Sequence, residues 1–355
     1  MRIAILHTHL APYFVNCLRE LKSKHAVELL IHAWTPEPNA PFDFQSLETL
    51  GTVHYRDESS EPEIYGRLMN FCPDAVLVCG WADNGYVRIC KRIRKAGVPV
   101  IAGCDTQYSG SWRQRLGSIS APFHIRRAFD VIWASGGRQV NLASFLGFSE
   151  DRIWQGYYSC DWERFEAVRS TRVSNRAFLY VGRYVEDKGT DLLAAAYEQY
   201  QREVDDPWPL LVAGKGPHEQ LLADAGASLL GFVQPEDLPS LMARAGVFLL
   251  PSLFEPWGVV LHEAAAAGMA IICTEKCGAG DHFVKSGENG LLIAAGSVTS
   301  LSQAMRRFHE MDGETLRRFG SASHELSKQY TPHLWVDTFM RGVTTIKKAG
   351  PRQSR

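Results

Sequence analysis

The stretch "DAVLVCGWADNGYVRICKRIRKAGVPVIAG", Asp74–Gly103, decides the fold class. Its two ends, "DAVLVCG" and "VPVIAG", are short runs of β-branched and aliphatic residues, which are typical of buried strands. Between them, "NGYVRICKRIRKAG" spaces its apolar residues at helical intervals and ends in a glycine. The order strand, helix, strand predicts a parallel sheet that is covered by helices on both faces.

The same alternation continues on both sides of this stretch and predicts two domains. It runs through "RIAIL", "VELLIHAW" and "DVIWAS", lapses over residues 156–175, and restarts with "RAFLYVG", "WPLLVAG", "SLLGF", "GVFLLPS" and "MAIICT". We expect an N-terminal domain over residues 1–165, a C-terminal domain over residues 166–330, and a helix and tail over residues 331–355 that lie back on the first domain. The predicted fold class is α/β, with two Rossmann-like, doubly wound parallel sheets facing a cleft.

Charge and hydropathy exclude several classes of partner. The 355 residues carry 38 basic and 39 acidic side chains, a formal net charge of -1, so no bulk field attracts nucleic acid. The start, "MRIAILHTHLAP", holds too few apolar residues for a signal peptide, and no later run reaches the ~20 apolar residues of a membrane-spanning helix. We therefore expect a cytoplasmic protein. The basic run Arg88–Lys95 is either a solvated helix face or a peripheral contact with the inner membrane face.

Two further classes of site are disfavoured by what the sequence lacks. The first predicted strand ends in "HTHLAPYF", without the G-x-G-x-x-G turn of a dinucleotide site, which counts against a dehydrogenase. Among the eight cysteines, the close pair Cys273 and Cys277 has no second pair or histidine at ligand spacing. We expect no metal site.

Two cations follow the first predicted strand of the second domain. In "YVGRYVEDKGTDLL", Arg183 comes directly after a strand-ending glycine, and Lys188 stands at the mouth of the next helix. Two cations at one strand edge can hold a diphosphate between them. The alternative is a solvated loop in which Lys188 pairs with Glu186 or Asp187.

The segment "FEPWGVVLHEAAAAG", Phe254–Gly268, predicts a second anion site. Its proline and glycine suggest a helix from about Trp257 to Ala267, whose first amides and dipole favour an anion. Glu255 would stand beside that anion and Glu263 two turns down the helix, where carboxylates accept hydroxyl groups. A diphosphate flanked by polyols indicates a nucleotide sugar. The alternatives are a dipole-stabilised acid and an exposed helical glutamate, and the apolar neighbours of Glu263 argue against the second.

These motifs together resemble the retaining GT-B glycosyltransferases of family four, which use nucleotide-diphosphate sugars. The matches fall in order over roughly residues 156–293. They comprise a "D-x-x-x-F" stretch at Asp161–Phe165, the "VGR-x-x-x-x-KG" element with Arg183, Lys188 and Gly189, the "GxGP" turn at Gly214–Pro217, the "GFV" loop at Gly231–Val233, and the E-x7-E pair Glu255 and Glu263. Independent motifs in the right strand-to-helix context support one another.

The resemblance implies a role for each matching residue. Arg183 and Lys188 would neutralise the leaving diphosphate, Glu255 would hold the donor sugar, and Glu263 would take the ribose hydroxyls. The remaining donor-binding candidates are Gly214, Gly216, Phe232, Val233, Pro256, Trp257, Gly258, Val259 and Val260. No metal or other cofactor is implied, the anomeric configuration would be retained, and the acceptor would be a carbohydrate, a lipid-linked sugar or a small molecule.

The first domain departs from the family pattern. The family's glycine pair after the first strand is absent, and Asp281 in "CGAGDHF" stands for a glutamate in the second domain. Family members place a histidine near the reacting carbon; His7, His9 and His124 are candidates, and we select His124. The acceptor side is assigned to His9, Asp105 and Gln107. The alternative functions are a nucleotide-sugar binding protein without transfer activity, a sugar-nucleotide epimerase and a phosphorylase.

Overall fold

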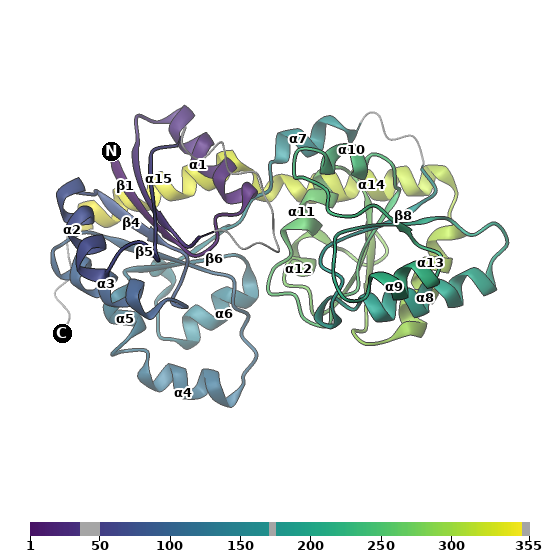
Figure 1. The fold of residues 1–355 in the computed structure, drawn as a ribbon, viewed down its shortest axis with the longest axis horizontal. Coiled ribbons are helices and arrows are strands. Elements are labelled where there is room, and N and C mark those ends of the chain that lie inside the picture. The colour runs from purple at the N-terminus through teal and green to yellow at the C-terminus, as the bar shows by residue number, and fades with distance from the viewer. Residues whose placement is uncertain (36–49, 170–174, 350–355) are drawn as a thin grey trace. The chain divides into compact units, whose positions relative to one another are not determined.

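The chain forms two compact α/β units (Figure 1). The computed structural model describes residues 1–35, 50–169 and 175–349. One unit comprises Met1–Ser159 with Pro332–Arg355, and the other comprises Cys160–Thr331. The unit boundary thus precedes helix α7 (Trp162–Ala167), whereas the predicted boundary at 165/166 falls inside that helix.

The first unit is built on a seven-stranded sheet in the order β3-β2-β1-β4-β5-β6-β7, and every pairing in it is parallel. The strands are β1 (Arg2–His7), β2 (Glu28–Ala33), β3 (Thr52–Tyr55), β4 (Ala75–Val78), β5 (Val100–Cys104), β6 (Val131–Ala134) and β7 (Ile153–Gln155). The helices are α1 (Pro12–Lys24), α2 (Glu61–Phe71), α3 (Asn84–Lys95), α4 (Trp112–Ser120), α5 (Ile125–Ala128) and α6 (Gly137–Phe145), with a 3-10 turn at Glu150–Arg152. Apolar clusters on both faces of the sheet make this the doubly wound arrangement that the sequence predicts.

Helix α15 (Pro332–Ala349) completes the first unit by packing beside α1 (Figure 1). Its buried residues Trp335 and Phe339 join Trp133 of β6 in one aromatic cluster, with the ring centroids of Trp133 and Trp335 4.7 Å apart. The indole Nε1 of Trp335 donates a hydrogen bond to the backbone oxygen of Tyr157 at 2.8 Å. An apolar body and a paired indole N–H fix the position of this helix.

The second unit has a six-stranded parallel sheet in the order β10-β9-β8-β11-β12-β13. Its strands are β8 (Phe178–Val181), β9 (Leu210–Ala213), β10 (Ser228–Leu229), β11 (Val247–Leu250), β12 (Ala270–Thr274) and β13 (Gly290–Ile293). Its helices after α7 are α8 (Thr190–Glu203), α9 (Glu219–Asp224), α10 (Leu238–Met242), α11 (Val259–Ala266), α12 (Gly280–Phe283), α13 (Val298–His309) and α14 (Gly313–Ser327), with 3-10 turns η4 (Glu186–Lys188) and η5 (Lys328–Tyr330). Strand order reverses between β8 and β11, the type of position at which open α/β sheets bind ligands.

Helix α11 is shorter than the sequence predicts. Its expected start at Trp257 is wrong, because Gly258 has a φ of 94° and the helix begins only at Val259. Among the described residues, no helix is both long and apolar enough to cross a bilayer.

Replacing Trp335 by alanine tests the attachment of α15. We expect Trp335→Ala to lower the free energy of unfolding of the first unit by about 3–5 kcal/mol, because a large buried side chain is removed from a packed cluster. Chemical denaturation followed by circular dichroism measures this loss. The matched control is Leu334→Ala at the neighbouring exposed position, which should cost far less. Equal losses in the two variants would contradict the packing described here.

Candidate functional site

The candidate site lies where strand order reverses in the second sheet. Strands β8 and β11 are parallel neighbours, with Phe178 opposite Val247, so their carboxyl ends meet at the same edge. Open α/β sheets bind ligands at such an edge. The loop after β8 carries Arg183 and Lys188, and the loop after β11 carries Glu255.

Lys188 and Glu255 are in direct contact across these two loops. The Lys188 Nζ donates to Glu255 Oε2 at 2.6 Å, and the two side chains are only 16% and 13% exposed. The amide of Leu253 also donates to the backbone oxygen of Asp187 at 2.9 Å, which ties the loops together. The alternative in which Lys188 pairs with Glu186 or Asp187 is therefore wrong.

Arg183 is held far less firmly than Lys188. Its guanidinium lies 3.6 Å from the Asp187 carboxylate, and its side chain is 69% exposed. Exposed ion pairs of this kind contribute little to stability, so Arg183 can exchange Asp187 for an anionic ligand at small cost.

The turn at Gly258 places the start of α11 beside Glu255. With its left-handed φ of 94°, a Cβ at this position would approach Glu255 Cγ to 3.0 Å, so a larger residue would displace the acid. In the described structure no side chain caps α11, and its first amides, from Val259 and Val260, have no partner within the helix. Unpaired amides and the positive end of the helix dipole favour an anion here.

The loop after β12 braces the backbone around Glu255. Glu255 N donates to Lys276 O at 3.3 Å, Gly278 N donates to Glu255 O at 3.0 Å, and Ala279 N donates to Trp257 O at 2.9 Å. The ring of Trp257 is buried, and its centroid lies 5.3 Å from that of His282, the residue after Asp281 in α12. The ring anchors this loop, and the predicted contact of the Trp257 segment with a donor stays a prediction. Pro256 precedes it in the same braced segment.

Glu263 lies about one turn after Val259, the first residue of α11, and is partly buried. Burial raises the pKa of its carboxyl from the ordinary 4.5 to about 8, and the nearby charge of Asp161 adds to the shift. Glu263 therefore carries a proton at pH 7 in the ligand-free chain. It is not the fully exposed helical glutamate of the alternative interpretation.

His262, beside Glu263, is a structural residue that the sequence interpretation missed. Its Nδ1 accepts from Cys160 N at 3.2 Å, and its Nε2 is 3.0 Å from the backbone oxygen of Ser327, so it links the first residue of this unit to the end of α14. Burial lowers its pKa to about 4, which keeps the imidazole neutral. The available signal was a histidine beside Glu263 in an otherwise apolar helix.

The loops after β9 and β10 lie next to the loop after β8. Gly214 N donates to Gly231 O at 2.8 Å, and Tyr184 N donates to Lys215 O at 2.9 Å. A Cβ on Gly214 would overlap the carbonyl oxygen of Gly182, so only glycine allows this close approach. Gly216, Phe232 and Val233 belong to the same group of loops, and the two apolar side chains are partly exposed.

In the first unit, strand order reverses between β1 and β4. Two of the candidate histidines lie at this edge: His7 is the last residue of β1, and His9 follows it two positions later. His7 is buried, with its Nε2 3.4 Å from the Tyr157 hydroxyl oxygen, and burial lowers its pKa to about 3. His9 is exposed and packs edge-to-face on Trp34 at 5.3 Å. The Trp34 Nε1 donates to Asp83 Oδ2 at 3.1 Å, a contact that joins the ends of separate strands and that sequence spacing does not indicate.

Asp105 and Gln107 follow β5 at the same edge and have defined partners. The Tyr158 hydroxyl donates to Asp105 Oδ2 at 3.2 Å, and burial raises the pKa of the Asp105 carboxyl. Arg138 donates to Gln107 Oε1 at 3.1 Å. These contacts hold the two side chains in place at the edge of the first sheet.

His124 lies away from the carboxyl edge, and its selection as the catalytic histidine is corrected. It is exposed at the start of α5, the helix that leads into the beginning of β6. Its Nδ1 is 3.4 Å from Lys91 Nζ on α3. No motif of fixed spacing includes His124, so the sequence alone could not indicate its position in the fold.

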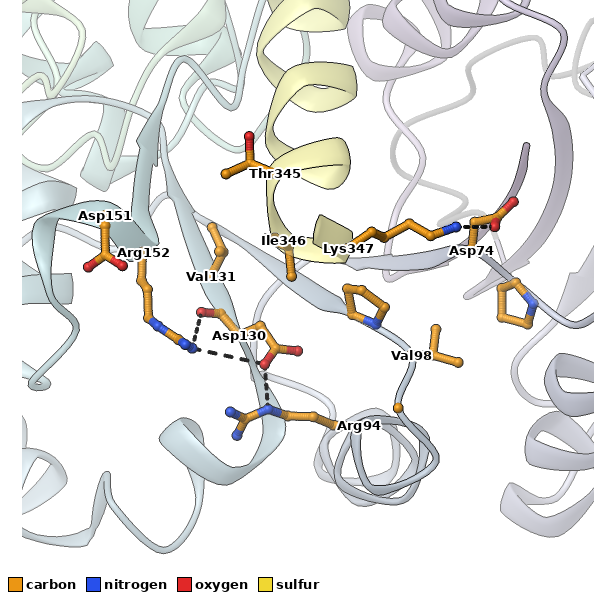
Figure 2. Close-up of a pocket in the computed structure, with 13 residues that line it drawn as sticks. Asp74, Arg94, Val98, Asp130, Val131, Asp151, Arg152, Thr345, Ile346 and Lys347 are labelled. Atoms are coloured by element: carbon orange, nitrogen blue, oxygen red, sulfur yellow. Dashed lines mark hydrogen bonds and ion pairs between the residues drawn. The ribbon is translucent and has the colours of Figure 1, made fainter. Parts of the chain in front are cut away.

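A pocket of about 320 Å³ opens at the opposite edge of the first sheet, where β5 and β6 begin (Figure 2). Its charged side chains neutralise one another: Arg94 Nε is 2.7 Å from Asp130 Oδ1, and Lys347 pairs with Asp74. This pocket lies at the amino ends of the strands and is distinct from the candidate site.

Over the described ranges, no group of three or more His, Cys, Asp or Glu side chains is placed to hold a metal ion.

Sequence comparison supports the assignment of the second unit. Residues 163–326 match the family described as glycosyl transferases group 1. A glycogen synthase from Mycobacterium tuberculosis is 29% identical over 197 residues, covering 53% of this chain but 46% of the relative, so the chain spans less than half of that protein. An MMP alpha-(1->4)-mannosyltransferase from Mycolicibacterium hassiacum is 29% identical over 95% of this chain and 82% of its own length.

A solved structure shows the same fold. HepE from Anabaena, crystallised in complex with UDP, aligns with a TM-score of 0.77 over 98% of this chain and 100% of its own, at 16% identity. With its two parallel-sheet α/β units, the chain therefore has the GT-B fold that the sequence predicts.

The protonation of Glu263 predicts a pH-dependent effect of Glu263→Gln. Between pH 4.5 and about 8 the unfolded chain ionises Glu263 while the folded chain keeps it neutral, so this residue lowers stability progressively as pH rises. Glutamine stays neutral. The melting temperature of Glu263→Gln relative to the unmodified protein should therefore increase from pH 5 to about pH 8 in thermal scans. Glu288→Gln at an exposed site is the control, and a difference independent of pH would contradict the buried, neutral carboxyl.

Proposed function

We propose that this protein is a retaining, metal-independent glycosyltransferase that moves a sugar from a nucleotide-diphosphate sugar to an acceptor hydroxyl, because residues 163–326 match the family described as glycosyl transferases group 1. One observation carries the proposal. Lys188 and Glu255 meet, largely buried, at the reversal of strand order and beside the uncapped start of α11. A cation, an acid and helix amides in one place match a ligand that has phosphate next to hydroxyl groups.

The donor would occupy the site in a defined direction. Its diphosphate would lie between the Lys188 ammonium, the Arg183 guanidinium and the amides of Val259 and Val260. Glu255 would accept hydrogen bonds from the sugar hydroxyls, and Glu263 from the ribose. The complexes of HepE with UDP and with UDP-glucose support a nucleotide sugar as the ligand of this fold.

Bond cleavage would develop negative charge beside these groups. As the bond between the anomeric carbon and the phosphate oxygen breaks, the diphosphate gains charge, and Lys188, Arg183 and the α11 amides stabilise it. The acceptor oxygen bonds to the anomeric carbon on the face that the diphosphate leaves. The acceptor proton passes to a leaving phosphate oxygen, so the products are a glycoside of retained configuration and a nucleoside diphosphate.

The names of the relatives indicate the class of acceptor. The glycogen synthase is named for the synthesis of a polysaccharide, and the MMP alpha-(1->4)-mannosyltransferase for the transfer of mannose. We infer a hydroxyl on a polysaccharide, a glycolipid or another glycoconjugate. Asp105 and Gln107, held at the edge of the first sheet, are the residues we assign to the acceptor side.

Removal of the Lys188 charge tests the proposal. We expect Lys188→Met to lower kcat/KM by about 10²–10³, because one preorganised donor to the developing charge is lost. The donor is first identified as the UDP-, GDP- or ADP-sugar that most raises the melting temperature. Lys285→Met is the matched control, since Lys285 forms an exposed ion pair with Glu288 in the same unit.

Equal turnover of the Lys188 and Lys285 variants would reject the site. Donor stabilisation without any transfer to sugar or glycolipid acceptors would instead identify a binding protein. The same assay run in excess EDTA should keep its rate, and nuclear magnetic resonance of the product should show the donor's anomeric configuration. Loss of activity with EDTA would reject the metal-independent mechanism.

A further inference from the structure

Helix α4 of the first unit presents a row of large apolar side chains to solvent. Trp112, Leu116, Ile119 and Phe123 are 65%, 57%, 72% and 61% exposed. The first three lie at helical spacing along one face, and Phe123 continues the row just beyond the helix end. Isolated exposed apolar residues are ordinary, but a contiguous row of this kind marks an interaction surface.

This face does not belong to the core of the first unit. No residue of α4 is buried, and Figure 1 shows the helix at the margin of that unit. The helix is nevertheless well formed at its start, because the Ser111 hydroxyl caps it by accepting from Gln114 N at 3.4 Å. The sequence therefore builds a capped helix whose apolar face is left uncovered within its own unit.

Arginines surround the apolar row. Residues 106–129 contain four arginines, Arg113, Arg115, Arg126 and Arg127, and no aspartate or glutamate. All four are exposed, and within the described part of the chain none of them forms an ion pair. Two lie over the ends of the row: Arg113 is 5.5 Å from the Trp112 ring, and Arg127 is 5.6 Å from the Phe123 ring.

The basic run Arg88–Lys95 contributes to this surface mainly through Lys91, which reaches His124. The other arginines of the run are engaged inside the unit: Arg88 pairs with Glu61, Arg92 stacks on Tyr65 and Arg94 pairs with Asp130. Most arginines of the run therefore have partners within the unit, as on a solvated helix face, and its contact with a membrane stays a prediction.

We propose that the face formed by Trp112, Leu116, Ile119 and Phe123, with its flanking arginines, docks the protein on an anionic lipid bilayer. Aromatic and aliphatic side chains on one face with arginines beside them are the composition of helices that lie in the membrane interface. The apolar row would enter the headgroup boundary while the arginines pair with lipid phosphates. These residues belong to the first unit and the donor-site residues to the second, so the test below does not depend on the proposed transfer reaction.

Charge argues against the other occupants. Two copies of this chain meeting through this face would bring eight arginines together, four from each copy, and residues 106–129 supply no aspartate or glutamate to pair with them. Nucleic acid would meet Leu116 and Ile119, aliphatic side chains that offer no stacking surface. An anionic bilayer satisfies both the apolar row and the surrounding charge.

Vesicle co-sedimentation tests the proposal on the full chain. We expect binding to vesicles of phosphatidylglycerol and phosphatidylcholine in equal parts, and little binding to phosphatidylcholine alone. Arg126→Gln/Arg127→Gln should weaken partitioning by about an order of magnitude or more, since each basic residue near the surface contributes several-fold. Raising salt from about 0.1 M to about 1 M should weaken binding of the unmodified protein, because the screening length falls from ~10 Å to ~3 Å.

A second variant separates the apolar row from the charges. Trp112→Ser/Ile119→Ser should lose vesicle binding while keeping the melting temperature, because both side chains are exposed. Leu221→Ser, at an exposed leucine of α9, is the matched control and should bind as the unmodified protein does. Equal binding by the Trp112/Ile119 variant, equal binding to neutral vesicles, or a dimer in sedimentation that the Trp112/Ile119 variant abolishes without any vesicle binding would each overturn the proposal.

Discussion

The contact between Lys188 and Glu255 is the constraint on which the candidate site depends. It exists because strand order reverses between β8 and β11, which brings two loops distant in sequence to one edge. Ion pairs removed from water recover their desolvation cost poorly, so a partly buried pair is weak evidence for stability alone. The pair also lies at the edge where open α/β sheets bind ligands. A phosphate could replace Glu255 as the partner of Lys188, and a hydroxyl could replace Lys188 as the partner of Glu255.

The surroundings of this pair are built to keep it in position. Gly258 takes a backbone conformation that larger residues resist, and this conformation both starts α11 and leaves room for the Glu255 side chain. The loop after β12 forms hydrogen bonds with the same backbone, and the buried ring of Trp257 anchors this segment. Preorganised groups of this type need no rearrangement when charge develops. The carboxyl of Glu263 differs from that of Glu255, because burial raises its pKa to about 8 and favours its neutral form.

Much of this could be predicted because periodicity and motif spacing are local properties of a sequence. Alternating strand and helix patterns predicted the two parallel sheets. Lys188 and Glu255 are separated by 67 positions in the sequence, and their meeting followed from the rule that parallel strands end at one edge of a sheet. Residues lacking such a rule were misplaced. His124 had no spacing partner, and the contact between Trp34 and Asp83 joins strand ends that no motif links. The exposed face of α4 has the same apolar spacing as a buried helix, so only coordinates reveal that nothing in its unit covers it.

A crystal structure of the full chain with the nucleoside diphosphate that most stabilises it would test the central claim most directly. The account predicts phosphate oxygens within ~2.7–3.2 Å of Lys188 Nζ and of the amides of Val259 or Val260, with Glu255 turned toward the space beyond the terminal phosphate. A diphosphate bound elsewhere, with the contact between Lys188 and Glu255 unchanged, would contradict it.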